Sequence, residues 1–430
     1  MVTTSGFSGN EMLCLSELGF APGDLVLGNS VIALGVQGGI QSAFSTMAGG
    51  EVKPVTKLIK DARTQAFERM SEAAKHKGVV GIAGINLDLV QHLNCQEVLC
   101  MGSLVKGENE NSFSAASDGQ DLYCQIDAGY WPVKFAFGNV AYSIGFANAI
   151  AGSIHSLGKG EVKEFSQVLY QTRELALARL LDSARESGAN SVLGIQTIIR
   201  PFLEIQEMMM VGTASFNENL PPECTQNPVS SSLSNSELWS LTKLGYAPVQ
   251  LLIGVSVYSL GIAGSIAASI KQVRGGEINE LSDLICEARE EAITKMKESA
   301  QQCGAKRVVG LKTYVFDLGA GMIEFFTIGT AVVKVAGLKT ESEILLPQAL
   351  MHEQDRERAS FQHVKPISAH SGGSSLDTIS AQNTDAQLVD GAVNYATKKL
   401  PKEIMGFLIP FSVLAGVMAL LLYLFFAWHR

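Results

Sequence analysis

The sequence predicts an α+β protein made of three tandem repeats, each a small antiparallel sheet packed by two helices, followed by one C-terminal transmembrane helix. Three observations predict this organisation: a Gly-Glu, Arg and Gly skeleton that occurs three times, apolar runs that switch between strand-like and helical spacing, and a long uncharged run near residue 430. A chain of 430 residues also exceeds what one hydrophobic core usually serves, so several domains are expected.

The skeleton keeps its spacing in every copy. Glu and Arg are 12 positions apart, and Arg and the closing Gly are 21 positions apart. The positions are Gly50, Glu51, Arg63 and Gly84 in the first copy, Gly160, Glu161, Arg173 and Gly194 in the second, and Gly276, Glu277, Arg289 and Gly310 in the third. One module is therefore expected at residues 11–106, 121–216 and 237–335.

Within a copy, the order strand, strand, helix, helix, strand, strand is predicted. A segment ending at the Gly-aromatic-x-Pro turn of residues 19–22 is expected to be a strand, and the apolar run from Leu25 a second strand in which Gly28 marks a bulge or a close backbone approach. Helical spacing predicts a short helix over residues 36–47. The Gly-Glu pair is expected to start a longer helix with its acid in the first turn, before two final strands.

Polar segments separate the repeats. Residues 107–119 and 217–235 are rich in Asn, Ser, Gly or Pro and predict tethers. Residues 341–402 predict a polar stalk, partly disordered. Residues 404–428 form 25 consecutive positions without a charge, which as a helix span roughly 37 Å and so exceed the bilayer core of about 30 Å. Lysines precede this span and aromatic residues end it, so a single-pass anchor with the body on the cytoplasmic side is expected.

Composition narrows the function classes. The net charge of −9 argues against a nucleic-acid partner, because such proteins concentrate positive charge. The seven cysteines are odd in number and form no CxxC pair, which indicates reduced thiols in a cytosolic compartment. The N-terminus has neither a basic stretch nor a continuous apolar run, so no secretory signal is expected.

The recurring charges allow two interpretations. In one, the Arg of each copy binds an anionic ligand at a subunit seam. In the other, which we favour at this point, the Glu is a helix-start charge and the Arg covers apolar surface while its head stays in water. A carboxylate that enters an apolar strand needs a partner, and the hypothesis is that the repeat's own Arg supplies it. The acids concerned are Glu97, Glu207 and Glu324.

No motif for catalysis, metal binding or a cofactor is found. The seven histidines do not recur across the copies, and HxxxH, HxH, GxSxG, GxGxxG and GxxxxGK[ST] are all absent. We therefore expect no catalytic residue, no metal and no cofactor, and interpret the chain as a non-enzyme.

The Gly-aromatic-x-Pro turn, the Gly28 strand, the Gly-Glu break, the Arg-x-x-Ala helix and the closing glycines resemble the YbjQ-like family of small domains, which carries a heavy-metal-binding label. The resemblance implies an α+β unit that assembles into closed homo-oligomeric rings, typically pentamers, without established catalytic activity. The metal label is not carried over, because the sequence offers no ligand set. The resemblance and the missing secretory signal favour a bacterial inner membrane, with delivery of a tail-anchored protein to another membrane as the alternative.

Together these features predict a membrane-seated scaffold whose partners are itself and the lipid bilayer. In this hypothesis each repeat forms a ring with the same repeat of neighbouring chains, and the rings stack into a barrel, cage or dome. Two alternatives remain: a module that senses a small molecule or metal ion at the seams between repeats, and a tethered adaptor for another protein.

Overall fold

The structure is a computed structural model, and it divides the chain into a compact unit, Met1–Ser368, and a second unit, Ala369–Arg430. All residues that the structure describes belong to the first unit. They are residues 2–33, 50–75, 79–92, 95–108, 112–143, 160–202, 205–259, 279–319 and 322–350.

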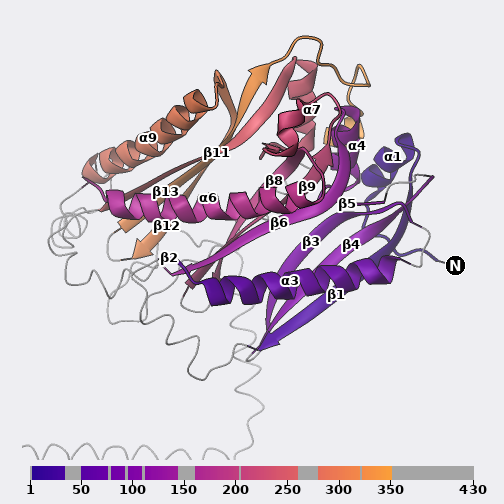
Figure 1. The fold of residues 1–430 in the computed structure, drawn as a ribbon, viewed down its shortest axis with the longest axis horizontal. Coiled ribbons are helices and arrows are strands. Elements are labelled where there is room, and N and C mark those ends of the chain that lie inside the picture. The colour runs from indigo at the N-terminus through magenta and orange to yellow at the C-terminus, as the bar shows by residue number, and fades with distance from the viewer. Residues whose placement is uncertain are drawn as a thin grey trace, which may run out of the picture. The chain divides into compact units, whose positions relative to one another are not determined.

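The first repeat contains two helices and four strands among its described residues (Figure 1). Its elements are α1 (Gly9–Glu17), β1 (Ala21–Ala33), β2 (Gly50–Glu51), α3 (Lys53–Ala74), β3 (Gly81–His92) and β4 (Cys95–Lys106). Strand β4 lies between β1 and β3 and is antiparallel to both. The mixed α+β class agrees with the prediction. The predicted short helix over residues 36–47 and its counterparts in the other two copies lie outside the described residues.

The second repeat reproduces this order, and the third does so apart from the counterpart of β2, which lies outside the described residues. The second consists of α4 (Gly119–Asp127), β6 (Trp131–Ser143), β7 (Gly160–Glu161), α6 (Lys163–Glu186), β8 (Ser191–Phe202) and β9 (Ile205–Phe216). The third consists of α7 (Asn235–Lys243), β11 (Tyr246–Ser259), α9 (Asn279–Gln302), β12 (Arg307–Gly319) and β13 (Met322–Lys334). Each repeat therefore pairs its three long strands in the same antiparallel way.

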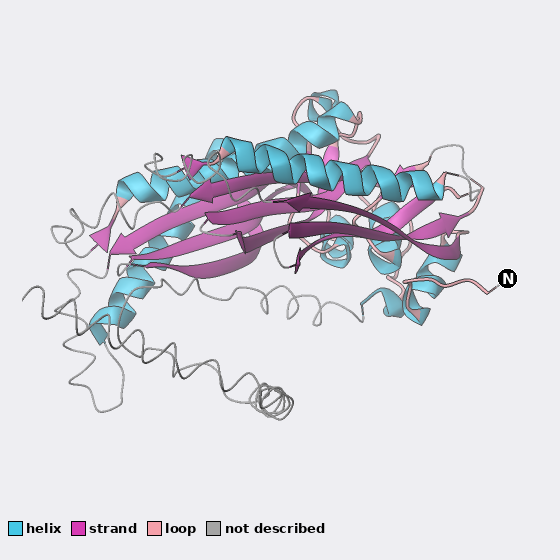
Figure 2. Ribbon diagram, turned by 90° about the horizontal axis from the view of Figure 1, so that it is seen from below, coloured by secondary structure: helices cyan, strands magenta, loops and turns pink. Residues whose placement is uncertain are grey.

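A long helix covers each sheet (Figures 1 and 2). One glycine per sheet allows this helix to come close. A Cβ atom added at Gly28 would lie 2.2 Å from the carbonyl oxygen of Ala66 in α3. The same pairs recur as Gly138 with Ala176 and Gly254 with Ala292. The close backbone approach predicted at Gly28 is thus confirmed, and the Ala of the Arg-x-x-Ala motif is its counterpart on the helix.

The segment before each Gly-aromatic-x-Pro turn is a helix, so the predicted opening strand is wrong. Ser8 caps α1 and forms a capping box with Glu11, and Ser234 forms the same box with Glu237 at α7. Reciprocal hydrogen bonds of this kind satisfy amide groups that a helix leaves open at its start. The turn glycines have positive φ, and Pro22 lies inside β1 beside a register shift.

The linkers are ordered where the structure describes them, which corrects the tether prediction. β5 (Phe113–Ser114) pairs in parallel with β3, and β10 (Val229–Ser230) pairs in parallel with β8. A short 3-10 helix, η2 (Pro222–Thr225), precedes β10 in the second linker. Each linker thereby adds a strand to the sheet of the repeat it leaves, and the sheets are not purely antiparallel.

The residues after the third repeat return to the short helices. η3 (Pro347–Leu350) packs against α1 and α4, and Leu345 joins a buried cluster with Cys14, Cys124 and Trp239. The carboxylate of Asp127 accepts hydrogen bonds from the Trp239 indole at 2.6 Å and from the Ser342 backbone at 3.1 Å. The start of the predicted polar stalk is therefore part of the folded unit.

No helix in the described part of the chain is long and apolar enough to span a membrane. The predicted span of residues 404–428 and most of the predicted stalk lie outside the described residues.

Candidate functional site: the seams between repeats

The first seam joins repeats 1 and 2 through a buried ion pair. Arg63 of α3 donates hydrogen bonds from both terminal nitrogens to the two carboxylate oxygens of Glu207 in β9, one of them at 2.7 Å. Both side chains are at most 2% exposed. Asn139 of β6 donates a further hydrogen bond to Glu207 at 3.1 Å. A bidentate pair is the strongest form of Arg–carboxylate contact, because two parallel bonds fix both planes.

The second seam repeats this arrangement between repeats 2 and 3. Arg173 of α6 donates from Nη2 to both carboxylate oxygens of Glu324 in β13, at 2.8 Å each, and from Nη1 to the Tyr142 hydroxyl at 2.8 Å. The Arg173 guanidinium also lies 5.1 Å from the ring centres of Tyr142 and Phe326. Although burial opposes the charge, the Glu324 carboxylate raises the pKa of Arg173 above its ordinary value.

These pairs correct two expectations. Glu207 and Glu324 are bound by the Arg of the preceding repeat, and not by the Arg of their own repeat. Arg63 and Arg173 are fully buried, so the interpretation with a wet Arg head is wrong for both. The recurring Arg does meet an anion at a seam, and that anion is a carboxylate of the same chain.

Two members of the recurring Arg and Glu positions, Glu97 and Arg289, do not take part in a seam among the described residues of the chain. Glu97, in repeat 1, accepts hydrogen bonds at 2.8 Å from Asn29 and contacts His92 at 2.8 Å. Arg289, in repeat 3, is exposed, with its guanidinium 6.0 Å from the Phe325 ring centre. Within the described ranges, no repeat precedes Glu97 and no further repeat follows Arg289.

The Gly-Glu pair also belongs to the seams, which corrects its prediction as a helix start. Glu51 lies in β2, which extends the sheet of repeat 2 by pairing with β6, and Glu161 lies in β7, which pairs with β11 of repeat 3. Gly50 and Gly160 have φ of 105° and 127°, a conformation that favours glycine. Gly276 and Glu277 lie outside the described residues.

Each of these glutamates meets a basic side chain of the next repeat. The Arg179 Nη2 atom forms an ion pair with Glu51 Oε1 at 2.7 Å, and Lys295 pairs with Glu161. These partners were not predicted from the sequence. The signal was available, because Arg69, Arg179 and Lys295 each follow the recurring Arg by six positions.

The seams are also continuous hydrophobic cores. One cluster combines Ala66 and Met70 of α3 with Phe135 and Met209 of repeat 2, and the Phe67 and Phe135 rings stack at 5.7 Å. A second cluster spans repeats 2 and 3 in the same manner. Backbone bonds add to this contact, since the Val52 amide donates to the Ala141 carbonyl and the Val162 amide to the Val257 carbonyl, both at 2.8 Å.

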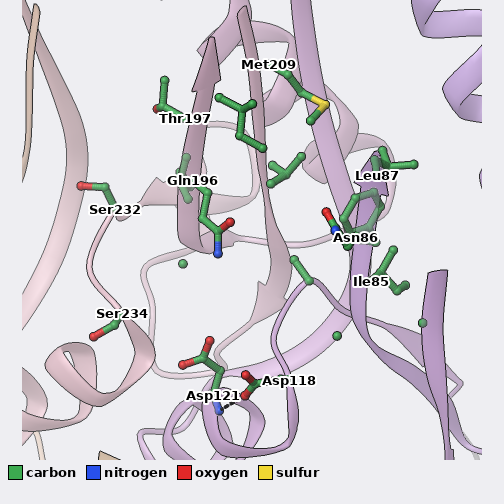
Figure 3. A pocket seen from close by; sticks show the side chains of 18 of the residues that line it. Ile85, Asn86, Leu87, Asp118, Asp121, Gln196, Thr197, Met209, Ser232 and Ser234 are labelled. Atoms are coloured by element: carbon green, nitrogen blue, oxygen red, sulfur yellow. Dashed lines mark hydrogen bonds between the residues drawn. The ribbon is translucent and has the colours of Figure 1, made fainter. Parts of the chain in front are cut away.

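The closing glycines position one polar residue per repeat in a shared cavity of about 700 Å³. Gly84, Gly194 and Gly310 have φ near 60° beside a register shift, and Asn86, Gln196 and Lys312 follow two positions later in the wall. Figure 3 shows Asn86 and Gln196 with Asp118 and Asp121. The backbone amide of Asp121 donates a hydrogen bond to the Asp118 carboxylate at 2.9 Å. The lining residues include acids, amides and bases, but no histidine or cysteine among those described.

The donor atoms present do not fit a heavy-metal site within the described ranges. No group of three His, Cys, Asp or Glu side chains there is arranged to hold a metal ion. His92 is occupied with Glu97, and the other six histidines lie outside the described residues.

The buried thiols are expected to resist modification. All seven cysteines are free, and Cys14 and Cys100 are buried, which raises their pKa to about 11 and about 12. Because the thiolate is the nucleophile, a thiol reagent at pH 8 should modify the exposed Cys286 first. Cys14, Cys100 and Cys124 should react only after unfolding in urea. Mass spectrometry of timed samples measures this order, and early labelling of Cys124 would contradict it.

Comparison with known proteins places the repeats in a wider group. Residues 20–108, 132–218 and 246–335 match the family described as "Putative heavy-metal-binding", YbjQ, which confirms the three tandem repeats and the resemblance seen in the sequence. The chain is 30% identical over 228 residues to a protein of Mycobacterium tuberculosis named as an encapsulin nanocompartment protein, covering 49% of this chain and 84% of that protein.

Shorter relatives match a single repeat. UPF0145 proteins of Thermoplasma volcanium and Methanocella arvoryzae are 38% and 40% identical over 80 and 79 residues, which is 19% and 18% of this chain and 66% of each relative.

Proposed function

We propose that this chain, which belongs to the YbjQ family through its three matched domains, is a non-enzymatic scaffold. In this proposal it assembles with further copies of itself. One observation carries the proposal. The described repeats use their largest buried charges and their sheet edges to bind one another, and not to hold a small substrate. The name of the M. tuberculosis relative, which describes a nanocompartment, supports the same reading.

The seams also change the kind of assembly that we propose. Repeat 2 is covered on one side by repeat 1 and on the other by repeat 3. Rings made of the same repeat from neighbouring chains, stacked on one another, would need these faces to be open. We therefore propose growth along the series of repeats, which can close into a ring, barrel, cage or dome.

The size of the full-length protein in mild detergent tests this function. Light scattering and single-particle electron microscopy should find closed particles whose mass is a multiple of 45.9 kDa. Dilution over the micromolar range should leave their size unchanged, because closed assemblies dissociate cooperatively. A particle that keeps the mass of one chain at all concentrations would remove the proposal.

Membrane attachment through residues 404–428 is a separate part of the proposal, supported by the length and uncharged character of that run. We propose a single-pass anchor with the repeats on the cytoplasmic side, in a bacterial inner membrane. The full-length protein should stay in the membrane pellet after alkaline carbonate extraction, whereas a chain ending at residue 403 should be released. Release of both would contradict the anchor.

The shared cavity favours ligand sensing at the seams as a second candidate. A ligand that binds the folded state raises its unfolding temperature in a concentration-dependent way. Thermal unfolding in the presence of small polar compounds and divalent metal ions tests this candidate independently of particle size.

A further inference from the structure

Strand β1 of repeat 1 exposes the surface that repeats 2 and 3 bury. Val31 is 56% exposed, whereas Ala141 and Val257, at the equivalent positions of β6 and β11, are fully buried. In both cases the preceding repeat covers this position. Elements β2 and α3 of repeat 1 cover β6, and elements β7 and α6 of repeat 2 cover β11. Leu25 and Leu27 of β1 are exposed in the same way, and β1 ends its sheet among the described strands.

Repeat 3 exposes the opposite surface. Leu311 and Val315 of β12 are 48% and 52% exposed, whereas their equivalents in β8, Ile195 and Ile199, are buried. The exposed face of repeat 3 is thus the equivalent of the face through which repeat 2 contacts repeat 3. An apolar edge of this kind attracts a further chain, because strand edges and apolar side chains both gain from being covered.

The charges on these two faces are complementary. Arg63 and Arg173 each bind a glutamate of the next repeat, which leaves Arg289 on the face of repeat 3 and Glu97 on the face of repeat 1. The surroundings of Glu97 already match those of Glu207. Asn29 donates a hydrogen bond to Glu97, as Asn139 does to Glu207. Hydrogen bonds from Asn29 and His92 hold the pKa of the Glu97 carboxyl below its ordinary value, which keeps it ionised at neutral pH.

We propose that two chains join head to tail, with the face of repeat 3 in one chain bound to the face of repeat 1 in a second copy, and with Arg289 of the first paired to Glu97 of the second. The joint would be a third example of the two seams already present within the chain. The contact is heterologous, because it joins two different surfaces. Repeating it makes a closed ring if the rotations between successive chains add up to a full turn. This inference rests on the proposed self-assembly and gives it a specific interface.

Charge reversal in the full-length protein tests the joint. Arg289→Glu and Glu97→Arg each place like charges together, so each should raise the dissociation constant of the assembly by roughly 100-fold or more, leaving single folded chains. The double variant Arg289→Glu/Glu97→Arg should assemble again, because every joint regains opposite charges. Mixing the two single variants should restore assembly as well, with the variants alternating. Mass photometry measures the particles, and circular dichroism verifies folding.

Arg185→Glu is the matched control, since this exposed arginine of repeat 2 contacts Asp182 and the Gln226 carbonyl, neither of which belongs to the two faces, and particle size should stay unchanged. If both single variants keep the wild-type size, the joint is overturned while the proposed self-assembly stands. Single variants that dissociate, with no recovery in the double variant or the mixture, would also overturn the pairing. A wild-type chain that is a monomer would remove the proposed function itself.

Discussion

Arg173→Ala is expected to lower the free energy of unfolding by about 3–5 kcal/mol, because it leaves the Glu324 carboxylate buried without its partner. The Tyr142 hydroxyl also loses a donor. Chemical denaturation followed by tryptophan fluorescence measures the loss, since Trp131 and Trp239 lie in the second and third repeats. A weakened seam should also separate the unfolding of repeat 3 from that of repeats 1 and 2.

A second variant distinguishes the lost pair from lost packing. Arg173→Met combined with Glu324→Leu removes both charges and keeps apolar volume, so stability should return to within about 1 kcal/mol of the wild type. Arg185→Ala removes an exposed pair with Asp182 and a hydrogen bond to the Gln226 carbonyl, and should cost about 1 kcal/mol or less. If Arg173→Ala costs no more than Arg185→Ala, the seam is not held by this ion pair.

Gly138→Ala is expected to cost about 3 kcal/mol, which is unusual for the addition of one methyl group. The new Cβ would lie 2.3 Å from the carbonyl oxygen of Ala176 and 2.5 Å from the backbone nitrogen of Leu180. Both are backbone atoms of α6, so relief requires the whole helix to move away from β6, and overpacking of this kind is costly. Thermal and urea unfolding measure the change.

Gly9→Ala is the matched control for this effect. Gly9 lies in α1 with nothing within 4 Å of an added Cβ, and alanine is the better helix former, so stability should stay the same or rise slightly. Equal stability of Gly138→Ala and Gly9→Ala would show that α6 is not seated against β6 as described.

Much of the fold could be predicted because its signals are local or repeated. Equal spacings revealed three modules without any knowledge of their shape, and the interior position of Gly28 in an apolar strand indicated a close approach. The opening strand was predicted wrongly, although the residues needed to correct it were present. Ser8 and Glu11, like Ser234 and Glu237, are spaced as a capping box, which indicates a helix start.

The partners at the seams could not be predicted from local pattern. Arg63 and Glu207 are 144 positions apart, and the sequence alone does not state which repeat lies beside which. The rule that a buried carboxylate needs a cation correctly singled out Glu207 and Glu324. It could not distinguish an arginine of the same repeat from one of the preceding repeat, since both are present at identical spacing.

The order of these partners along the chain has a consequence for synthesis on the ribosome. Arg63 is translated long before Glu207, and Arg173 long before Glu324, so each repeat emerges with a cation that must stay hydrated until its successor appears. Completion of one repeat therefore depends on translation of the next, and the nascent polypeptide matures from its N-terminal end with a delay of one repeat. A pause in translation after residue 106 would leave the first repeat incomplete, because the Phe67 ring stacks on Phe135 of the strand that has not yet been made.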